Sequence, residues 1–325
     1  IRSGWLTQGE RTAELERRFA ERVGVKHAIA VSSATAGLYL VARALGIGPD
    51  DEVIVPSLTF VATVGAMVQV GAQPIFADVE SDDRLLIDPA DVERRITPKT
   101  RAVVVVHYAG YPCNMEAFTR LAGERGLLLI EDCAHAPPAD WQGRQAGAFG
   151  DAGVFSFFSN KNLATGEGGM IVTNDEASAE RCRLLRSHAM TRQTLERHRG
   201  HAFDYDVVDL GYNYRFDELR AAIGMAQLEK LELNTRRRAE AADRYRKLLK
   251  DIDWIRVPFE APFPGRSAHH IFPVLLNENA PPRERVMTGL RDAGIQTSIH
   301  YRPVHTFSYY REKFAVPDSD LPRTL

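Results

Sequence analysis

Unbroken apolar runs separated by amphipathic helical stretches constrain the fold of this chain more than any other feature. Residues 103–106 are four consecutive valines, and residues 127–130 are a second run of large aliphatic side chains. Strands of this kind are buried on both faces, which is typical of a mostly parallel sheet covered by helices on both sides. The sequence therefore predicts an α/β protein with a three-layer, mostly parallel sheet.

The intervening stretches carry helical signals. Leu15, Phe19 and Val23 recur every four residues, which predicts one apolar stripe along a helix. Asp88-Pro89 combines an N-terminal cap with a first-turn proline, and Gly126 ends a later helical stretch. We expect helices over 36–45, 59–70, 88–96, 115–125, 217–249 and 283–293, and further strands over 27–31, 53–55, 74–77, 271–276 and 296–299.

Composition excludes several classes of protein. Forty-one Lys and Arg against 43 Asp and Glu give a net charge of −2, which argues against binding nucleic acid or an anionic membrane by bulk charge. No apolar run approaches the length of a membrane span, and no signal peptide is recognisable at the start. The three cysteines lack paired spacing, which fits a reducing compartment. We expect a cytoplasmic enzyme.

The length of 325 residues predicts one large domain and one smaller domain. We place the large domain at 1–232 and a smaller C-terminal α+β domain at 233–325. Residues 190–206 are polar and rich in His and Arg, which indicates a surface excursion. The sequence lacks an initiator Met, and we expect both termini to be incomplete.

In parallel sheets, ligands bind beyond the carboxyl ends of the strands. Polar residues follow the predicted strands at 32–35, 57–60, 107–108 and 132–135. Ser32 to Thr35 combine hydroxyls with a predicted helix start, so they could bind a phosphate, although such residues more often only cap a helix. Phe60 could stack on a flat cofactor ring or simply fill the core.

One lysine stands in the segment richest in chemical signals. Lys161 follows an aromatic strand and precedes a glycine-rich turn, Gly166-Glu167-Gly168-Gly169. A lysine whose pKa is lowered by burial or by a neighbour can form a Schiff base with an aldehyde. By itself, this pattern also fits a surface lysine beside a turn.

A carboxylate at the end of a buried strand indicates what kind of ligand could react with the lysine. Asp132 is costly to bury unless it meets a cation or caps the next turn. The protonated pyridine nitrogen of pyridoxal 5'-phosphate (PLP) is such a cation, and PLP requires it in order to act as an electron sink. Cys133 and His135 lack the third and fourth ligands of a zinc site, so we predict no metal site.

Several of these segments, taken together and in order, resemble the DegT/DnrJ/StrS family of PLP-dependent sugar aminotransferases, which have the aspartate aminotransferase fold (PLP fold type I). The match extends over essentially the whole chain. The segments that carry it are Ser3-Gly4-Trp5-Leu6-Thr7-Gln8-Gly9, Pro56-Ser57-Leu58-Thr59-Phe60, Ile130-Glu131-Asp132-Cys133-Ala134-His135-Ala136, the Lys161 segment, and Gly211-Tyr212-Asn213-Tyr214-Arg215-Phe216-Asp217-Glu218.

The resemblance implies a role for each matching residue. Lys161 is implied to be the Schiff-base lysine, Asp132 to pair with the pyridine nitrogen and His135 to face the ring hydroxyl. Phe60 is the implied stacking aromatic. The implied phosphate ligands are Ala34, Thr35 and Ser156, together with Asn213, which reaches the cofactor of the neighbouring subunit in a homodimer with shared active sites. His300 and Tyr301 are implied to face the sugar substrate. Ala34 departs from the family, which usually has Gly at that position, so its Cβ could narrow the phosphate site.

The implied reaction moves an amino group from an amino acid, expected to be L-glutamate, to a nucleotide-linked ketosugar. Two alternatives stay open: a PLP-dependent sugar dehydratase of the same family, in which a histidine commonly replaces the lysine, and a non-catalytic PLP-binding regulatory homologue. The choice of sugar is expected to depend on residues 190–206 and 300–310.

Overall fold

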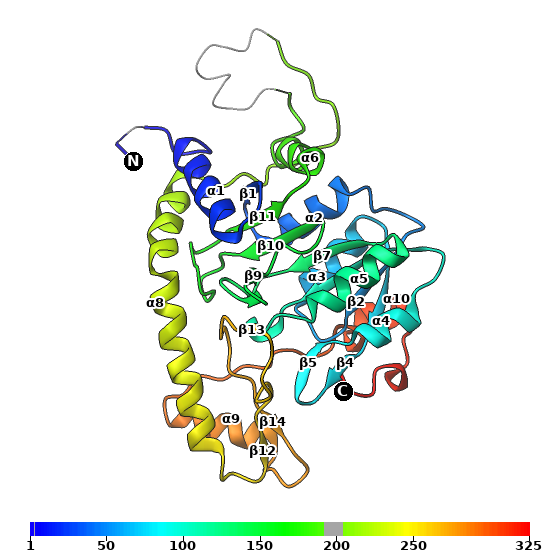
Figure 1. Ribbon diagram of the computed structural model, residues 1–325, viewed down its shortest axis with the longest axis vertical. Helices are drawn as coiled ribbons and strands as arrows, with labels where there is room; N and C mark the ends of the chain where they lie inside the picture. Colours follow the sequence, from blue (N-terminus) through cyan, green and yellow to red (C-terminus); the bar gives the residue numbers. More distant parts are fainter. Residues whose placement is uncertain (3, 192–203) are drawn as a thin grey trace.

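A seven-stranded sheet forms the centre of the computed structural model, which describes residues 1–2, 4–191 and 204–325 (Figure 1). The strand order is β1-β11-β10-β7-β6-β2-β3, and β11 runs antiparallel to its two neighbours while the other pairs are parallel. The predicted mostly parallel, three-layer sheet is confirmed. The strand bounds are β1 His27–Val31, β2 Glu52–Pro56, β3 Gln73–Ala77, β6 Thr100–Val106, β7 Leu128–Asp132, β10 Ala152–Ser156 and β11 Gly169–Thr173.

Helices cover both faces of this sheet. Neighbouring valines of β6 point to opposite sides, so Val104 packs in the core under α2, α3 and α6 while Val103 packs in the core under α4 and α5. A third core joins the start of the chain to β10, β11 and α8. Because both faces are covered, the strands are apolar along most of their length, and polar residues such as Asp132 and Ser156 stand at their ends. The helix bounds are α1 Glu10–Val23, α2 Ala34–Ala44, α3 Val61–Gln69, α4 Pro89–Arg95, α5 Met115–Arg125, α6 Glu176–Arg186 and α8 Glu218–Leu249.

Local signals place the ends of these helices. The side chain of Asp88 accepts a hydrogen bond from the Ala90 N–H and caps α4, and Asp217 caps α8 through the N–H of Arg220. Gly126 ends α5 in the left-handed conformation, with a φ of 64°. These three boundaries agree with the sequence prediction, because each depends on a side chain or a glycine within one turn of the helix end.

The C-terminal part differs more from the prediction. Helix α9 spans Arg283–Asp292, but only Leu275–Leu276 (β14) of the predicted strand 271–276 is extended, paired with β12, Ile255–Arg256. The predicted strand 296–299 is wrong. A strand needs a hydrogen-bonded neighbour, and residues 296–299 are exposed and have no ladder partner among the described residues.

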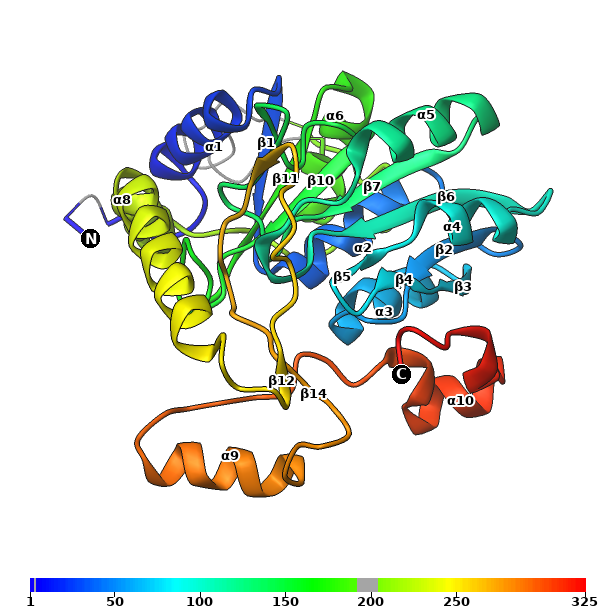
Figure 2. The ribbon, with the colours of Figure 1, turned by 60° about the horizontal axis from the view of Figure 1, so that its bottom comes forward.

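The last part of the chain returns to the central sheet. Figure 2 shows α8 leading away to the segment with β12, β14 and α9, and α10 (Ser308–Phe314) lying back near the sheet. Val304, Tyr310 and Leu321 are buried in the core that also holds α2 and α3. The division into domains at 1–232 and 233–325 stays a prediction.

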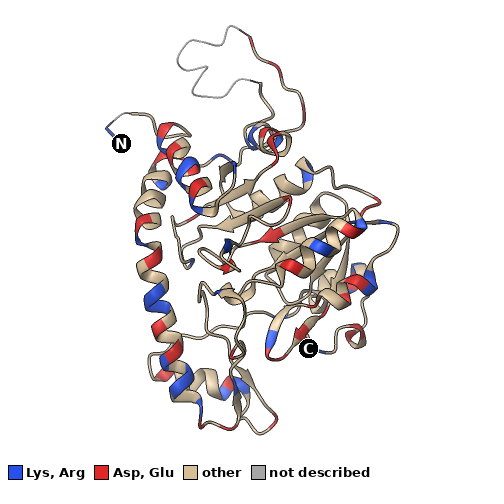
Figure 3. Ribbon diagram, in the orientation of Figure 1, with Lys and Arg blue, Asp and Glu red and all other residues tan. Residues whose placement is uncertain are grey.

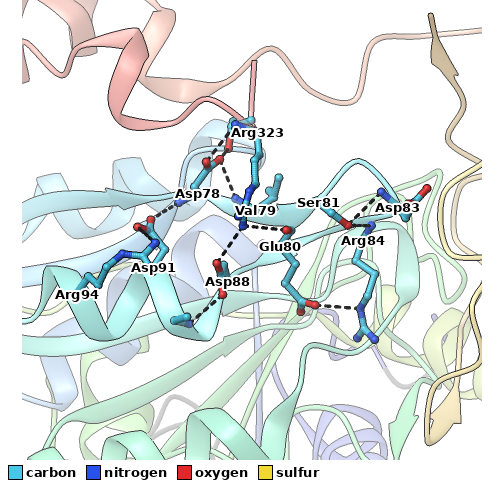
Figure 4. Close-up of polar contacts among 12 residues, drawn as sticks. Asp78, Val79, Glu80, Ser81, Asp83, Arg84, Asp88, Asp91, Arg94 and Arg323 are labelled. Carbon is cyan, nitrogen blue, oxygen red and sulfur yellow. Dashed lines mark hydrogen bonds and ion pairs between the residues drawn. The ribbon is translucent and has the colours of Figure 1, made fainter.

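Polar contacts fix this returning end (Figure 4). The Arg323 N–H donates to Asp78 Oδ2 at 3.0 Å, and its guanidinium donates to the carbonyl oxygen of Glu80 at 2.9 Å. Asp91 Oδ2 accepts from the Asp78 N–H at 2.7 Å, which ties the same turn to α4. The C-terminal segment is therefore attached to the end of β3.

Charges of both signs alternate along the outer helices, most visibly α1 and α8 (Figure 3). Among the described residues, the structure contains no helix with the length and apolarity needed to span a bilayer. The predicted excursion at 190–206 falls mostly on residues 192–203, which lie outside the described residues.

Candidate active site

Asp132 lies at the carboxyl end of β7, in the middle of the sheet. Its side chain is only 5% exposed. Oδ2 accepts a hydrogen bond from the Thr63 hydroxyl at 2.7 Å, and Oδ1 accepts one from the Ala134 N–H at 3.0 Å. Burial raises the pKa of Asp132 above its usual value, and these two donors and the charge of Lys161 oppose that rise. The carboxylate has hydrogen bonds but, among the described residues, no cation within ion-pair distance.

Lys161 lies in the loop that joins β10 to β11, beside the end of β7. Its backbone N–H donates to the carbonyl of Phe158 at 2.9 Å, which fixes the start of the loop. Burial lowers the pKa of the Lys161 amine from 10.5 to about 8, and the charge of Asp132 acts in the opposite direction. A substantial fraction of this amine is therefore neutral near physiological pH, as a nucleophile requires.

The start of α2, the end of β10 and the start of β11 meet at Gly169. A Cβ on Gly169 would lie 2.7 Å from the Ala34 nitrogen and 2.9 Å from the carbonyl oxygen of Phe155. Ser156 pairs directly with Gly169 across the two strands. The side chain of Ser33 caps α2 by accepting from the Ala36 N–H, which leaves the earlier N–H groups of the first turn, at Ala34 and Thr35, for another acceptor. The glycine lets a helix N-terminus approach the sheet edge, which suits an anion.

Phe60 projects from the N-terminal cap of α3. Phe60 is 56% exposed, which is unusual for a phenylalanine just beyond the carboxyl end of a buried strand, here β2. The ring of Tyr301 lies 5.8 Å away, measured between ring centroids. An exposed aromatic face beside the ring of Tyr301 favours stacking on a ligand over core filling.

His135 connects the sheet edge to the returning C-terminal segment. Its Nδ1 accepts from the Ala109 N–H at 3.2 Å, so the proton of the neutral ring lies on Nε2, which donates to the Tyr301 hydroxyl oxygen at 3.0 Å. Burial holds the pKa of His135 well below its usual value. His300 is the neighbour of Tyr301, and its Nδ1 lies 2.9 Å from the Ser298 hydroxyl.

Two residues of this site escaped the sequence analysis. Thr63 contacts Asp132, and its spacing from Thr59 by one helical turn was the available signal. His270 lies with its ring 4.4 Å from that of His135, and its Nδ1 is 3.1 Å from Asn162 Oδ1, next to Lys161. His270 Nε2 is buried without a hydrogen-bond partner, and burial lowers the pKa of His270 to about 2. The His269-His270 pair gave no local sign of this position.

The predicted residues separate into three groups. Contacts join Asp132 to α3, and His135 to Tyr301 and His270, around the loop of Lys161. Ala34 and Ser156 meet at Gly169, with Thr35 exposed beside them. Asn213 is exposed and pairs with Ser187 through an isolated bridge, and among the described residues no hydrogen bond joins its side chain to either group.

A buried cluster behind the site brings His107, Glu131 and Cys133 together. Glu131 is fully buried and accepts from the N–H groups of Gly147, Phe149 and Gly150, while His107 Nε2 lies 2.9 Å from its Oε2. The carboxylate already has four polar partners. We therefore interpret this cluster as one that holds a loop against the sheet, not as a metal site.

The arrangement fits PLP. Among the described residues, the buried Asp132 carboxylate has no cation within ion-pair distance, the pKa of the Lys161 amine is lowered to about 8, a helix N-terminus approaches the sheet at Gly169, and Phe60 offers an aromatic face. Fold and site together define a PLP-dependent transferase of fold type I.

Comparison with known proteins identifies the family. The chain matches the DegT/DnrJ/EryC1/StrS aminotransferase family over residues 1–325, and it belongs to that family. It is 40% identical to the spore coat polysaccharide biosynthesis protein SpsC of Bacillus subtilis (strain 168), over 100% of this chain and 84% of SpsC.

Two solved structures are similar along nearly the whole chain. PseC of Helicobacter pylori, an aminotransferase of pseudoaminic acid biosynthesis, shares 31% identity with a TM-score of 0.91, covering 99% of this chain and 85% of PseC. DesI, solved in the presence of its TDP-sugar product, shares 35% identity with a TM-score of 0.86, covering 99% of this chain and 79% of DesI. The chain is a PLP-dependent sugar aminotransferase, as the sequence resemblance predicted.

Proposed function

We propose that this enzyme transfers an amino group from L-glutamate to a nucleotide-linked ketosugar and that Lys161 and Asp132 are its central residues. The observation that carries the proposal is the Lys161 amine, whose pKa is lowered to about 8, beside the buried Asp132 carboxylate at the end of the neighbouring strand β7. The TDP-sugar product of DesI supports a nucleotide-linked substrate.

The site residues would hold the cofactor through distinct groups. Asp132 would meet the pyridine nitrogen, and Phe60 would cover one face of the ring. His135 would face the ring hydroxyl. The phosphate would be bound by the N–H groups at the start of α2, Ala34 and Thr35, and by the Ser156 hydroxyl.

Bound PLP supplies an electron sink that stabilises negative charge developing on the carbon that bears the transferred nitrogen. Lys161 Nζ would hold the aldehyde group of the cofactor and, when free, would take the proton from the α carbon of glutamate. In the second half of the reaction, the same nitrogen would deliver a proton to the carbon of the sugar that receives the amine. Asp132 would keep the pyridine nitrogen protonated in both halves. One lysine thus serves as both anchor and general acid–base.

Substrate contacts are proposed on the returning C-terminal segment. Tyr301 accepts the His135 Nε2–H, so its own proton stays available for an oxygen of the sugar. His300 precedes it, and its pKa is lowered by burial, which favours the neutral ring. Neutral donors and acceptors suit the hydroxyl groups of a sugar.

We also propose a homodimer with shared active sites, in which Asn213 binds the phosphate of the partner subunit's cofactor. The exposure of Asn213, and the absence among the described residues of a hydrogen bond from its side chain to the other predicted residues, support a role across an interface.

The direct test uses Lys161→Ala with Lys99→Ala as a matched control, since Lys99 is exposed just before β6, away from the site. Each protein is incubated with PLP, L-glutamate and a panel of nucleotide-ketosugars, and 2-oxoglutarate and aminosugar are quantified. We expect turnover by the wild-type and Lys99→Ala proteins and none by Lys161→Ala. Turnover by Lys161→Ala would contradict the proposal.

A further inference from the structure

A chain of buried hydroxyl groups ends on the Asp132 carboxylate. Thr63 Oγ1 lies 2.7 Å from Asp132 Oδ2, and Thr59 Oγ1 lies 2.8 Å from Thr63 Oγ1. Thr63 is 0% exposed and Thr59 is 1% exposed, so neither hydroxyl exchanges these partners for water. Both residues stand at the start of α3.

The direction of the chain follows from hydrogen-bond chemistry. An ionised carboxylate only accepts, so the Thr63 proton points at Asp132. The Thr63 oxygen must then accept the proton of Thr59. Every hydroxyl dipole in the series is aligned toward the carboxylate, and aligned hydrogen bonds strengthen one another in a low-dielectric interior.

We propose that Thr63, supported by Thr59, is a positioning residue that keeps Asp132 ionised and directed at the cofactor's pyridine nitrogen. The inference rests on the proposed function, because it assumes that Asp132 meets that nitrogen. Thr63 touches no reacting atom and acts only through Asp132.

The buried Asp132 carboxylate needs hydrogen-bond donors to stay ionised. Burial raises the pKa of Asp132, and the Thr63 hydroxyl and the Ala134 N–H lower it. The Ala134 bond comes from the backbone two residues further on and occupies Oδ1, so Oδ2 depends on Thr63. Without Thr63, the pKa of Asp132 would rise further, opposed only by the Ala134 N–H and the charges of Lys161 and His107, and the protonated acid cannot pair with a pyridinium.

The same helix start also carries Phe60. Phe60 is the N-terminal cap of α3, Thr59 precedes it and Thr63 lies in the first turn, so the start of one helix sets both the aromatic face and the orientation of the carboxylate. The placement explains why a threonine fully enclosed by protein retains a hydroxyl, where valine would fill the same volume.

The test measures PLP affinity of the cofactor-free protein, as a Kd from equilibrium dialysis across a pH series. The variants are Thr63→Val, which removes the hydroxyl at nearly constant shape, Thr63→Ser, which retains it, and Asp132→Asn. Thr235→Val is the matched control, because Thr235 is also buried and its hydroxyl donates to a backbone carbonyl within α8 at 2.8 Å. Thermal unfolding of each cofactor-free protein checks the fold.

We expect Thr63→Val to weaken PLP binding about 10-fold or more near neutral pH, because hydrogen bonds to charged groups contribute that much. The acidic limb of its Kd–pH profile should move to higher pH by about 1 unit, since Asp132 protonates more easily. Thr63→Ser should restore most of the affinity and the position of the limb. Thr59→Val should have a smaller effect, about 2- to 5-fold.

The results distinguish the positioning role of Thr63 from the proposed role of Asp132. If Asp132→Asn weakens binding and Thr63→Val leaves both the Kd and the acidic limb unchanged, the positioning role is overturned while the proposed function stands. Equal losses in Thr63→Val and Thr63→Ser, or in Thr235→Val, would also overturn it, since the hydroxyl would then not be the cause. If Asp132→Asn binds PLP as the wild-type protein does, the proposed role of Asp132 fails.

Discussion

The Tyr301 hydroxyl lies 3.0 Å from His135 Nε2, and this contact joins the returning C-terminal segment to the sheet edge that carries Asp132. Burial raises the pKa of Tyr301, so the phenol keeps its proton throughout the physiological range. Two residues separated by 166 positions in the sequence thus form one polar group beside the loop of Lys161.

Replacing Tyr301 with Phe should affect the sugar half of the reaction selectively. The substitution removes the proposed donor to the sugar and leaves the ring, so the KM for the ketosugar should rise about 10-fold. The half-reaction with L-glutamate, followed by absorbance, should change little. Tyr309→Phe is the control, because Tyr309 is exposed on α10. Equal losses in both half-reactions would contradict a role in sugar binding.

Lys161 should destabilise the cofactor-free protein below about pH 8. The folded pKa is about 8 and the ordinary value is 10.5, so the unfolded chain binds the proton more tightly. Stability from this group therefore increases as pH rises from about 8 to 10.5. Lys161→Met should be more stable than wild type by about 1–3 kcal/mol at pH 7, with a smaller gain at pH 10. Urea unfolding at the two pH values measures this. A gain independent of pH would point to packing instead.

Gly169→Ala should weaken phosphate binding. Its Cβ would press on the Ala34 nitrogen at 2.7 Å and displace the start of α2. We expect the Kd for PLP to rise at least about 10-fold, with a smaller change for pyridoxal, which lacks the phosphate. Gly123→Ala is the control, because a Cβ at this position in α5 would meet nothing within 4 Å. Equal losses for PLP and pyridoxal would argue against a phosphate site at Gly169.

Mixing two inactive variants should restore activity if the active sites are shared. In a hybrid dimer of Lys161→Ala and Asn213→Ala subunits, one site would carry both defects and the other neither. We expect activity to appear after the two proteins are unfolded and refolded together, above the sum of the separate proteins. Light scattering checks that the dimer forms. No gain with hybrid dimers present would place Asn213 outside the partner's site.

Glu131→Ala should be strongly destabilising. The fully buried Glu131 carboxylate accepts three backbone N–H bonds, one buried and two half-buried, and pairs with the buried His107. Removing the carboxylate leaves these groups unsatisfied, which costs about 3–5 kcal/mol in urea unfolding. Glu93→Ala, which breaks an exposed pair with Arg125, should cost no more than about 1 kcal/mol. Similar values for the two variants would show that the buried network contributes little.

The sequence by itself determined the central sheet and most of its covering helices, and it predicted the residues that we propose to meet the cofactor. Short stretches of sequence indicate these features. Four valines indicate a strand buried on both faces, Asp88 and Gly126 indicate helix ends, and Lys161 precedes a glycine-rich turn. Each signal depends on neighbours within one or two turns, so it is readable without knowing the rest of the fold.

Only the tertiary structure decided the remainder. Residues 296–299 have the composition of a strand but no ladder partner among the described residues, and sheet pairing is a long-range event that composition does not specify. Thr63 reaches Asp132 across 69 positions, and His270 reaches Asn162 across 108. The pKa of Lys161 likewise depends on burial, which is a property of everything packed around the side chain.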